Sequence, residues 1–305
     1  MKALVTIGLS TLSKDVTRVV AWRPFGSDPA CRSHRRRRKH RRIDLMDLSI
    51  VIPVKNEADN IAPLIGEIGT ALDGLTEYEI LYVDDGSDDA TSSEISRLAC
   101  TAPQVRLLRH SRNYGQSAAI STGVHAARGA WIATLDGDGQ NDPADLPAMW
   151  HLARQASASP PLLITGHRER RRDSWSKRVA SRIANAIRGR LLGDHTPDTG
   201  CGLKLFPRSL FLGLPYFDHM HRFLPALVLR EGGRVLSVPV NHRPRHKGVS
   251  KYGVFDRLGV GIVDLLGVMW LQRRAPRPRP FHEVTLAAAP AAAEDPRLSA
   301  IATVR

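Results

Sequence analysis

The sequence predicts an α/β fold in which a mixed, mostly parallel sheet is flanked by helices. Three observations support this prediction. From residue 48 onward, short apolar runs alternate with longer stretches whose apolar residues recur at helical spacing. A strand–helix alternation of this kind is typical of parallel sheets with right-handed crossovers. Polar clusters directly follow several apolar runs, at the strand ends where such sheets gather their ligands.

Four strands and three helices account for the first half of the predicted domain. The run at 48–54 is apolar almost throughout, which is typical of a strand buried on both faces. The helix expected at 57–73 has one apolar face, formed by Ile61, Leu64, Ile65, Ile68 and Leu72. The elements that follow are strands at 79–83, 105–108 and 131–135 and helices at 91–100 and 116–128.

The order of elements changes beyond residue 160. We expect a strand at 162–165, a basic helical region at 171–193 and a Gly-rich loop at 198–202, then mixed elements to about residue 240. The chain shows no internal repeat, and 42% hydrophobic residues are enough for one core. The Ala- and Pro-rich tail at 275–305 is predicted to be disordered.

The positive charge of the chain is concentrated near its beginning. Residues 1–45 hold twelve Lys and Arg against three acids, so this arm carries +9 of the net +14. We expect the arm to be disordered. Since Met46 stands just before the first clear strand, the arm is interpreted as an upstream extension that the fold does not need. Contact with an anionic membrane or with nucleic acid is the alternative.

Several common classes of protein lack support in this sequence. The three cysteines show no CxxC spacing, which argues against a zinc site or a disulfide framework and favours a reducing cytosol. No apolar run reaches eighteen residues, and the first twenty residues lack a clean signal peptide. No GxGxxG follows the first strand and no GxxxxGK[ST] occurs, so a Rossmann dinucleotide site and a P-loop are not expected.

Two polar clusters at predicted strand ends carry the candidate chemistry. Asp136 and Asp138 follow the apolar run 131–135, and carboxylates at a buried strand end are costly unless a cation balances them. Mg²⁺ or Mn²⁺ carrying a diphosphate suits such oxygen ligands, although calcium loops and solvated turns also contain Asp-x-Asp. Asp85 could accept hydrogen bonds from a nucleobase edge or a ribose, and Asp88 or Asp89 could cap the next helix. Turn and capping chemistry alone is the alternative for this second cluster.

Seven motifs stand in a characteristic order along residues 48–271. They are Ile52–Glu57, Val83–Ser87, Asn113–Gly115, Asp136–Gln140, Gly166–Arg168, Asp198–Lys204 and Arg245–Tyr252. With these motifs the chain resembles family 2 glycosyltransferases of the GT-A fold, and within them the polyprenyl-phosphate branch, which is dolichol-phosphate mannose synthase-like. The resemblance implies a single GT-A catalytic domain at 46–253.

The resemblance also implies roles for individual residues. The residues expected to contact the base and ribose of the donor are Pro53, Asn56, Glu57 and Asp85. The ligands expected for Mg²⁺ or Mn²⁺ on the sugar diphosphate are Asp136, Asp138 and Gln140. The residues expected to hold the acceptor phosphate are Arg168, Arg178, Ser181 and Arg182. A mobile loop is expected to close over the phosphates with Arg245, Ser250 and Lys251. Among all of these, the expected catalytic residues are Asp138, Arg168 and Arg245.

A few positions depart from the pattern of the family. Lys55 stands where an aromatic residue is usual, and Lys204 where Arg is usual, although Arg and Lys are not interchangeable at bidentate sites. Gly137 and Gly139 replace bulkier residues. These departures bear on the donor base and the acceptor more than on the class of reaction.

The implied reaction is an inverting transfer of a hexose from a nucleotide sugar to polyprenyl or dolichyl phosphate at the cytosolic membrane face. GDP-mannose is the predicted donor, and a UDP-sugar is the alternative. An acceptor phosphate is already an anionic nucleophile, so it needs positioning and charge screening rather than a strong base. A membrane- or nucleic-acid-binding protein with an inactive transferase domain is the alternative of another class. The intact motif residues argue against it, and we do not expect nucleic acid as a partner.

Three further features leave alternatives open. The segment 254–274 is predicted as an amphipathic helix in the membrane interface, because its apolar stretch is too short to span and ends at Arg273 and Arg274. A core-packing helix is the alternative. His219 and His221 are interpreted as packing residues before a helix, with the acceptor site as the alternative. Cys201 is interpreted as a small buried thiol.

Overall fold

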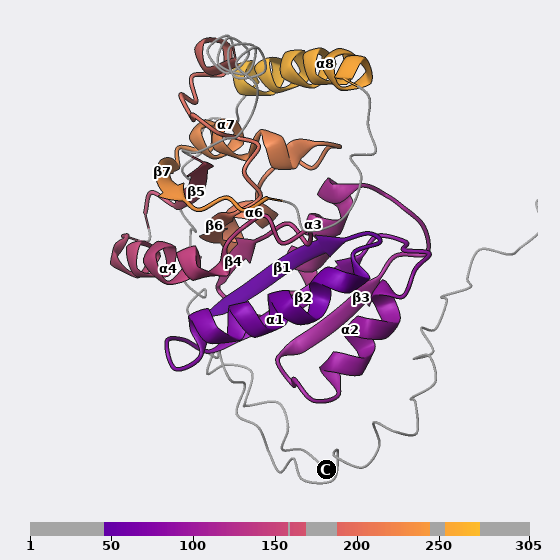
Figure 1. Ribbon diagram of the computed structural model, residues 1–305. Coiled ribbons are helices and arrows are strands. Elements are labelled where there is room, and N and C mark those ends of the chain that lie inside the picture. Colours follow the sequence, from indigo (N-terminus) through magenta and orange to yellow (C-terminus); the bar gives the residue numbers. More distant parts are fainter. Residues whose placement is uncertain (1–45, 158, 169–187, 245–253, 275–305) are drawn as a thin grey trace, which may run out of the picture.

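The computed structural model describes residues 46–157, 159–168, 188–244 and 254–274. Within them, one seven-stranded sheet has the order β3-β2-β1-β4-β6-β5-β7. The strands are β1 (Leu48–Val54), β2 (Tyr78–Asp84), β3 (Val105–Arg109), β4 (Trp131–Thr134), β5 (Leu162–Arg168), β6 (Lys204–Pro207) and β7 (Arg234–Val240). The predicted α/β fold with a mostly parallel sheet is thereby confirmed (Figure 1).

The pairing of the strands creates a switch point in the middle of the sheet. Strand β1 pairs in parallel with β2 on one side and with β4 on the other. Strands β2 and β3 are added in order on the first side, and the chain then crosses to the second side to form β4. Strand β6 runs antiparallel to both β4 and β5, and β7 is parallel to β5. In open α/β sheets, the crevice at the carboxyl ends of strands flanking a switch point is the usual ligand site.

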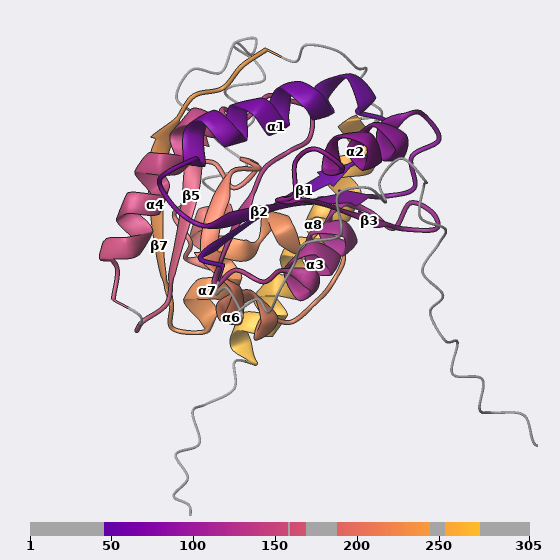
Figure 2. The same ribbon diagram turned by 90° about the horizontal axis from the view of Figure 1, so that it is seen from below.

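Helices cover both faces of the sheet and bury two apolar cores. The helices are α1 (Ala58–Leu72), α2 (Thr91–Ala99), α3 (Gln116–Ala126), α4 (Leu146–Gln155), α6 (Arg208–Leu212), α7 (Leu224–Arg230) and α8 (Val254–Arg273). One core packs α1, α2 and α4 against the sheet, and the other packs α3, α6 and α7 against the opposite face (Figure 2). Successive strand residues alternate between these cores: Ile50 and Ile52 face the first and Val51 faces the second.

The sequence patterns located the early elements closely. The helix predicted at 57–73 is Ala58–Leu72, and the one predicted at 116–128 is Gln116–Ala126. Most of the basic helical region predicted at 171–193 lies outside the described residues, although 188–192 are helical. The arm at 1–45 and the tail at 275–305 also lie outside, so their predicted disorder and the domain boundaries stay predictions.

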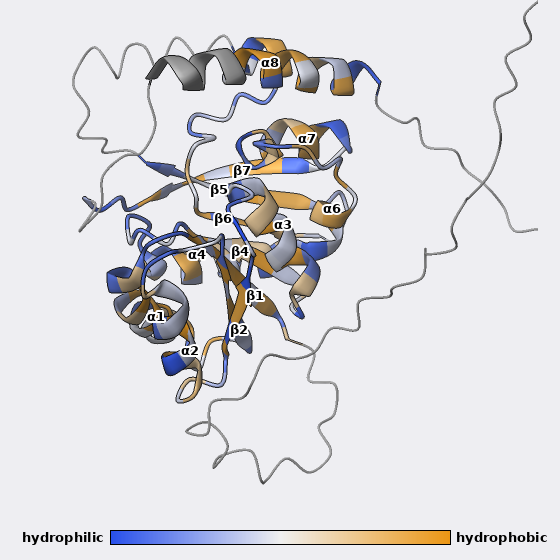
Figure 3. Cartoon of the chain, turned by 90° about the vertical axis from the view of Figure 1, so that its right-hand side faces the viewer, coloured by the Kyte–Doolittle hydropathy of each residue, from blue (hydrophilic) through white to orange (hydrophobic). Residues whose placement is uncertain are grey.

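Helix α8 packs against the body with one face and leaves an apolar face uncovered. Val268 is fully buried in the core under α7, and Leu265 and Met269 pack beside it. Four apolar residues of the helix are each at least half exposed: Ile262, Val263, Leu266 and Trp270. Figure 3 shows α8 at the margin of the body, with much of its length coloured as hydrophobic. The helix therefore has a core-packing side and an exposed apolar side, and its predicted place in the membrane interface stays a prediction. None of the helices described is at once long and apolar enough to cross a membrane.

Candidate active site

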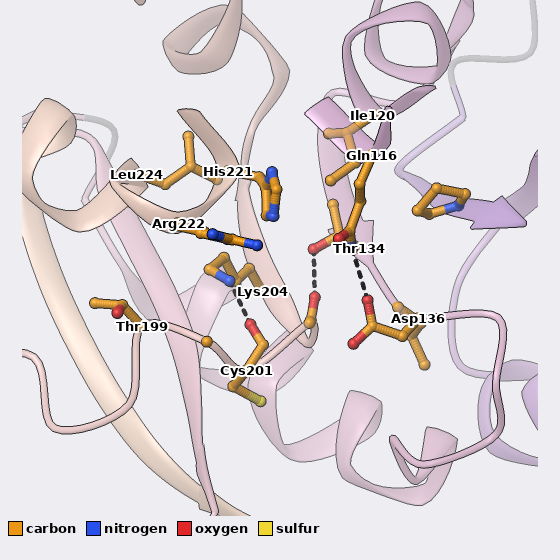
Figure 4. Close-up of a pocket in the computed structure, with 14 residues that line it drawn as sticks. Gln116, Ile120, Thr134, Asp136, Thr199, Cys201, Lys204, His221, Arg222 and Leu224 are labelled. Carbon is orange, nitrogen blue, oxygen red and sulfur yellow. Dashed lines mark hydrogen bonds between the residues drawn. The ribbon is translucent and has the colours of Figure 1, made fainter. Parts of the chain in front are cut away.

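A pocket of about 290 Å³ opens at the carboxyl ends of β1 and β4, at the switch point of the sheet (Figure 4). Its lining residues come from β1, α3, the end of β4, the Gly-rich loop, β6 and the segment before α7. They are Pro53, Gln116, Ile120, Thr134, Leu135, Asp136, Thr199, Gly200, Cys201, Gly202, Lys204, His221, Arg222 and Leu224. The pocket therefore contains two of the predicted site residues, Pro53 and Asp136.

Asp136 stands just beyond β4, and hydrogen bonds hold both its carboxylate and its backbone amide. Gln116 Nε2, at the start of α3, donates to Asp136 Oδ1 at 2.8 Å, and the Asp136 amide donates to Asn141 Oδ1 at 3.0 Å. Desolvation, and after it the nearby charge of Asp138, raises the pKa of Asp136. Both effects disfavour the ionised carboxylate, so a cation at this position would relieve an unfavourable charge.

The residues around Asp136 fit a hard divalent cation. A Cβ on Gly202 would lie 2.1 Å from Asp136 Oδ2, so only glycine lets the backbone lie against this carboxylate. Within the described ranges, no group of three or more His, Cys, Asp and Glu side chains could enclose a metal ion. Mg²⁺ commonly takes one or two carboxylates and completes its shell with phosphates and water. Asp136, Asp138 and the predicted Gln140 therefore suit a metal that arrives with a diphosphate.

Asp85 is tied into the protein by three hydrogen bonds. Its carboxylate accepts from the amides of Tyr114 and Gly115 and from His110 Nδ1, all at 2.8 Å. These bonds attach the 113–115 loop to the end of β2. A role for Asp85 at the donor base or ribose stays a prediction, and its structural role as a loop anchor was missed in the sequence.

Asn56 and Glu57 also connect loops at this edge of the sheet. Asn56 adopts a left-handed conformation (φ 57°), and its side chain exchanges two hydrogen bonds with Asp88. The Glu57 amide donates to Thr91 Oγ1 at 2.9 Å, and the Glu57 carboxylate accepts from Asn60. The loops after β1 and β2 are thus joined. The expected contacts of Asn56 and Glu57 with a donor stay predictions.

Arg168 lies at the end of β5 and is paired with Asp198. Its Nε and Nη2 donate to the two Asp198 carboxylate oxygens at 2.6 and 2.9 Å. Burial alone would lower the pKa of Arg168, but the hydrogen bonds and charge of Asp198 outweigh burial and raise the pKa. The expectation that Arg168 holds the acceptor phosphate stays a prediction. Six other predicted site residues lie outside the described residues: Arg178, Ser181, Arg182, Arg245, Ser250 and Lys251.

The structure adds a cationic wall to the site: Lys204 at the start of β6 and Arg222 before α7. From the sequence, Lys204 was treated only as a departure from a family motif, and Arg222 was given no role. Lys204 is only 4% exposed, and its ammonium donates to the Cys201 carbonyl. Desolvation lowers the pKa of Lys204. The sequence held a signal for Arg222, because it directly follows His221, for which the acceptor site was the alternative interpretation.

His221 lies beside this wall and belongs to the pocket rather than only to packing. Its Nδ1 lies 2.7 Å from Ser117 Oγ. Desolvation, followed by the charges of Lys204 and Arg222, lowers the pKa of His221 to about 3, so the imidazole is neutral at pH 7. His219 Nδ1 instead lies 3.0 Å from Asp264 Oδ2 on α8. Burial raises the pKa of the Cys201 thiol, which agrees with a packing role.

The loop that carries the predicted metal ligands is joined to the chain before residue 245. The Arg243 amide donates to the Gln140 carbonyl at 3.0 Å, and Arg243 Nη2 donates to Asp142 at 2.6 Å. A second arm of the guanidinium bonds Glu67 on α1 at 2.8 Å. Arg243 therefore fixes the end of the described segment before residue 245 beside the loop that carries the predicted metal ligands.

A mixed sheet with paired carboxylates at its switch point is the architecture of GT-A glycosyltransferases, and solved structures agree. Glucosyl-3-phosphoglycerate synthase from Mycobacterium tuberculosis, in complex with Mn²⁺, UDP and glucosyl-3-phosphoglycerate, matches with a TM-score of 0.54 at 18% identity, over 76% of this chain and 81% of that one. Mannosyl-3-phosphoglycerate synthase from Rubrobacter xylanophilus matches with a TM-score of 0.58 at 18% identity, over 79% of each chain. At this identity the likeness establishes the fold.

Residues 49–213 match the family model for glycosyl transferase family 2, and the chain belongs to that family. Dodecaprenyl-phosphate galacturonate synthase from Rhizobium johnstonii is 36% identical over 78% of this chain and 71% of its own length. Undecaprenyl-phosphate 4-deoxy-4-formamido-L-arabinose transferase from Edwardsiella ictaluri is 36% identical over 70% of this chain and 65% of its own length, just under two thirds. The resemblance to the polyprenyl-phosphate branch is thereby confirmed.

Proposed function

We propose that the protein transfers a sugar from a nucleotide sugar to the phosphate of a polyprenyl phosphate, with inversion at the anomeric carbon. The observation that carries this proposal is the pocket itself, which sets the Asp136 carboxylate opposite the cations of Lys204 and Arg222. A nucleotide sugar and an acceptor phosphate both bring anionic groups, one matched to a metal and the other to a cation. Two relatives that share 36% identity are named for transfer involving polyprenyl phosphates.

The chain's residues suit a displacement that needs no general base. An acceptor phosphate is anionic at neutral pH and needs to be oriented and screened. His221 is neutral and bonded to Ser117, and the Cys201 thiol has a raised pKa, so neither is prepared to remove a proton or attack. A divalent cation held by Asp136 and Asp138 would stabilise the departing nucleoside diphosphate. Gln116 and Gly202 keep the first of these carboxylates in place.

The donor is the least constrained part of the proposal. GDP-mannose remains the prediction from the motifs, whereas the two relatives are named for galacturonate and for a formamido-arabinose. We therefore extend the proposal to UDP-sugars, including a hexuronate.

We further propose that the protein works on a membrane surface, on its cytosolic face. Support comes from α8, whose uncovered apolar residues run toward Arg273 and Arg274. An apolar helix face with basic residues at its end suits the headgroup region of an anionic bilayer. A polyprenyl acceptor would present its phosphate at the same level.

The test is direct. Purified protein with Mn²⁺ or Mg²⁺ is incubated with undecaprenyl phosphate and a panel of GDP- and UDP-sugars, and the lipid product is weighed by mass spectrometry. One donor should give a lipid-linked monosaccharide, and no product with any donor would contradict the proposal. Asp138→Ala should abolish transfer while the melting temperature without metal stays within a few degrees, and should remove stabilisation by Mn²⁺. Full activity of this variant in EDTA would rule out the metal role.

A further inference from the structure

Two cations of the pocket form no ion pair with a carboxylate among the described residues. Lys204 is 4% exposed, and its ammonium has a hydrogen bond to the Cys201 carbonyl but, among the described residues, no carboxylate within 4 Å. Arg222 lines the same pocket in an exposed position, and no ion pair or hydrogen bond of its guanidinium occurs within the described ranges. Arg168, by contrast, is paired with Asp198.

A buried ammonium that touches no carboxylate is costly, and the charges of Asp136 and Asp198 offset this cost only from beyond ion-pair distance. An anionic ligand in contact with the ammonium would offset this cost further. Arg222 adds a planar guanidinium with donors suited to two oxygens of a phosphate. The pair is therefore built for an anionic group that enters the pocket.

The position of the pair indicates which anion this is. Figure 4 shows Lys204 and Arg222 on one side of the pocket and Asp136 on the other. The diphosphate of a donor belongs at the Asp136 side, where the metal ligands are predicted. In an inverting displacement the nucleophile approaches from the side opposite the leaving group, which is the Lys204–Arg222 side.

We propose that Lys204 and Arg222 bind the phosphate of the lipid acceptor and hold it for attack on the donor sugar. This inference rests on the proposed function. The neighbouring contact between His221 and Ser117 fixes the short turn that carries Arg222, because both the His221 ring and its amide lie against Ser117 Oγ. Arg168, which the motifs assign to the same phosphate, is held by Asp198 and would act from the edge of the site.

The test compares Arg222→Gln with Arg222→Lys and with Arg234→Gln. Arg234 is an exposed arginine at the start of the edge strand β7, does not line the pocket, and serves as the matched control. Arg222→Gln should raise KM for undecaprenyl phosphate about tenfold or more, as expected for loss of charge-assisted hydrogen bonds. Its affinity for the donor nucleotide with Mn²⁺, measured by calorimetry, should not change. Arg222→Lys should recover part of the loss, and Arg234→Gln should match the wild type.

Weaker nucleotide binding with an unchanged KM for undecaprenyl phosphate would assign Arg222 to the donor and overturn the inference. So would wild-type values for both quantities. A measurement of lipid binding tests the inference even if no donor is turned over. Undecaprenyl phosphate in detergent should raise the melting temperature of the wild type but not of Arg222→Gln, and equal shifts would overturn the inference. Inorganic phosphate in a parallel titration shows whether the headgroup alone suffices. Failure of the proposed function would appear differently, as absence of lipid product from the wild type.

Discussion

Gly202→Ala should disable sugar transfer while leaving a folded protein. A Cβ at this position would lie 2.1 Å from Oδ2, 2.3 Å from Cγ and 2.6 Å from Oδ1 of Asp136. Non-bonded carbon and oxygen atoms do not approach so closely, so the carboxylate or the loop must move by about 1 Å or more. The atoms in the way belong to a side chain, and Asp136 can rotate to relieve the clash.

The magnitude follows from what the rotation breaks. The displaced carboxylate loses its 2.8 Å hydrogen bond from Gln116, which costs about 1.5–3 kcal/mol for a bond to a charged group. Misplacing a positioning group by about 1 Å lowers rates by roughly 10²-fold. We therefore expect kcat/KM to fall by about two orders of magnitude, with a modest loss of stability.

The assay measures initial rates of lipid-linked sugar formation over a Mn²⁺ titration, together with thermal unfolding. Gly213→Ala is the matched control, because Gly213 does not line the pocket and a Cβ there would meet the Leu210 and Ser209 carbonyls at 3.5 and 3.7 Å, which are ordinary contacts. Wild-type kinetics for Gly202→Ala, or an equal loss for both variants, would refute the reasoning about this contact.

Three further predictions concern pH, the membrane and the core. The folded state holds the pKa of His221 at about 3, below its ordinary 6.5. The free energy of unfolding should therefore fall by up to about 1.4 kcal/mol per pH unit as pH drops from 6.5 toward 3. His221→Gln should flatten this slope in denaturant titrations, and an identical slope would contradict the burial argument. Leu266→Glu on the exposed side of α8 should weaken flotation of the protein with anionic liposomes. Leu75→Glu, at an exposed leucine outside α8, should not weaken it. Equal flotation of the two variants would favour the core-helix alternative. Tyr82→Phe removes a buried hydroxyl without a partner among the described residues, so its melting temperature should equal or exceed that of the wild type, and a clear drop would reveal a missed hydrogen bond.

The first half of the fold was predictable because each element there has a clear apolar pattern in its own stretch of sequence. Strand β1 is apolar apart from Ser49, β2 contains the apolar run 80–83, and α1 carries a regular buried stripe. The second half lacks such signals. Strand β6 is four residues long and begins with a lysine, and β7 is half exposed and contains Pro239. Their places in the sheet are set by tertiary pairing, which single-sequence patterns do not contain.

The same limit explains which parts of the site were found. Asp136 was predictable because its motif directly follows a strand. Lys204 was not, because its nearness to Asp136 arises from the antiparallel pairing of β6 with β4, in which Lys204 stands opposite Thr134. Residues 68 positions apart in sequence thus come to one pocket. The structural role of Asp85, which holds the 113–115 loop, was also not predictable, since that loop follows β3 and is distant in sequence from Asp85.

The contacts of the loop that carries the predicted metal ligands show why the site should be rigid before any ligand arrives. Three segments distant in sequence hold it: Gln116 of α3 bonds Asp136, the Gly202 backbone lies against the same carboxylate, and Arg243 bonds the Gln140 carbonyl and Asp142. A carboxylate fixed by its surroundings needs little reorganisation when charge develops on a leaving group. Because each support comes from a different part of the chain, the pocket can form only when the sheet is complete. Substitutions at these supports should therefore act on activity more strongly than on stability, in contrast to substitutions in the two cores.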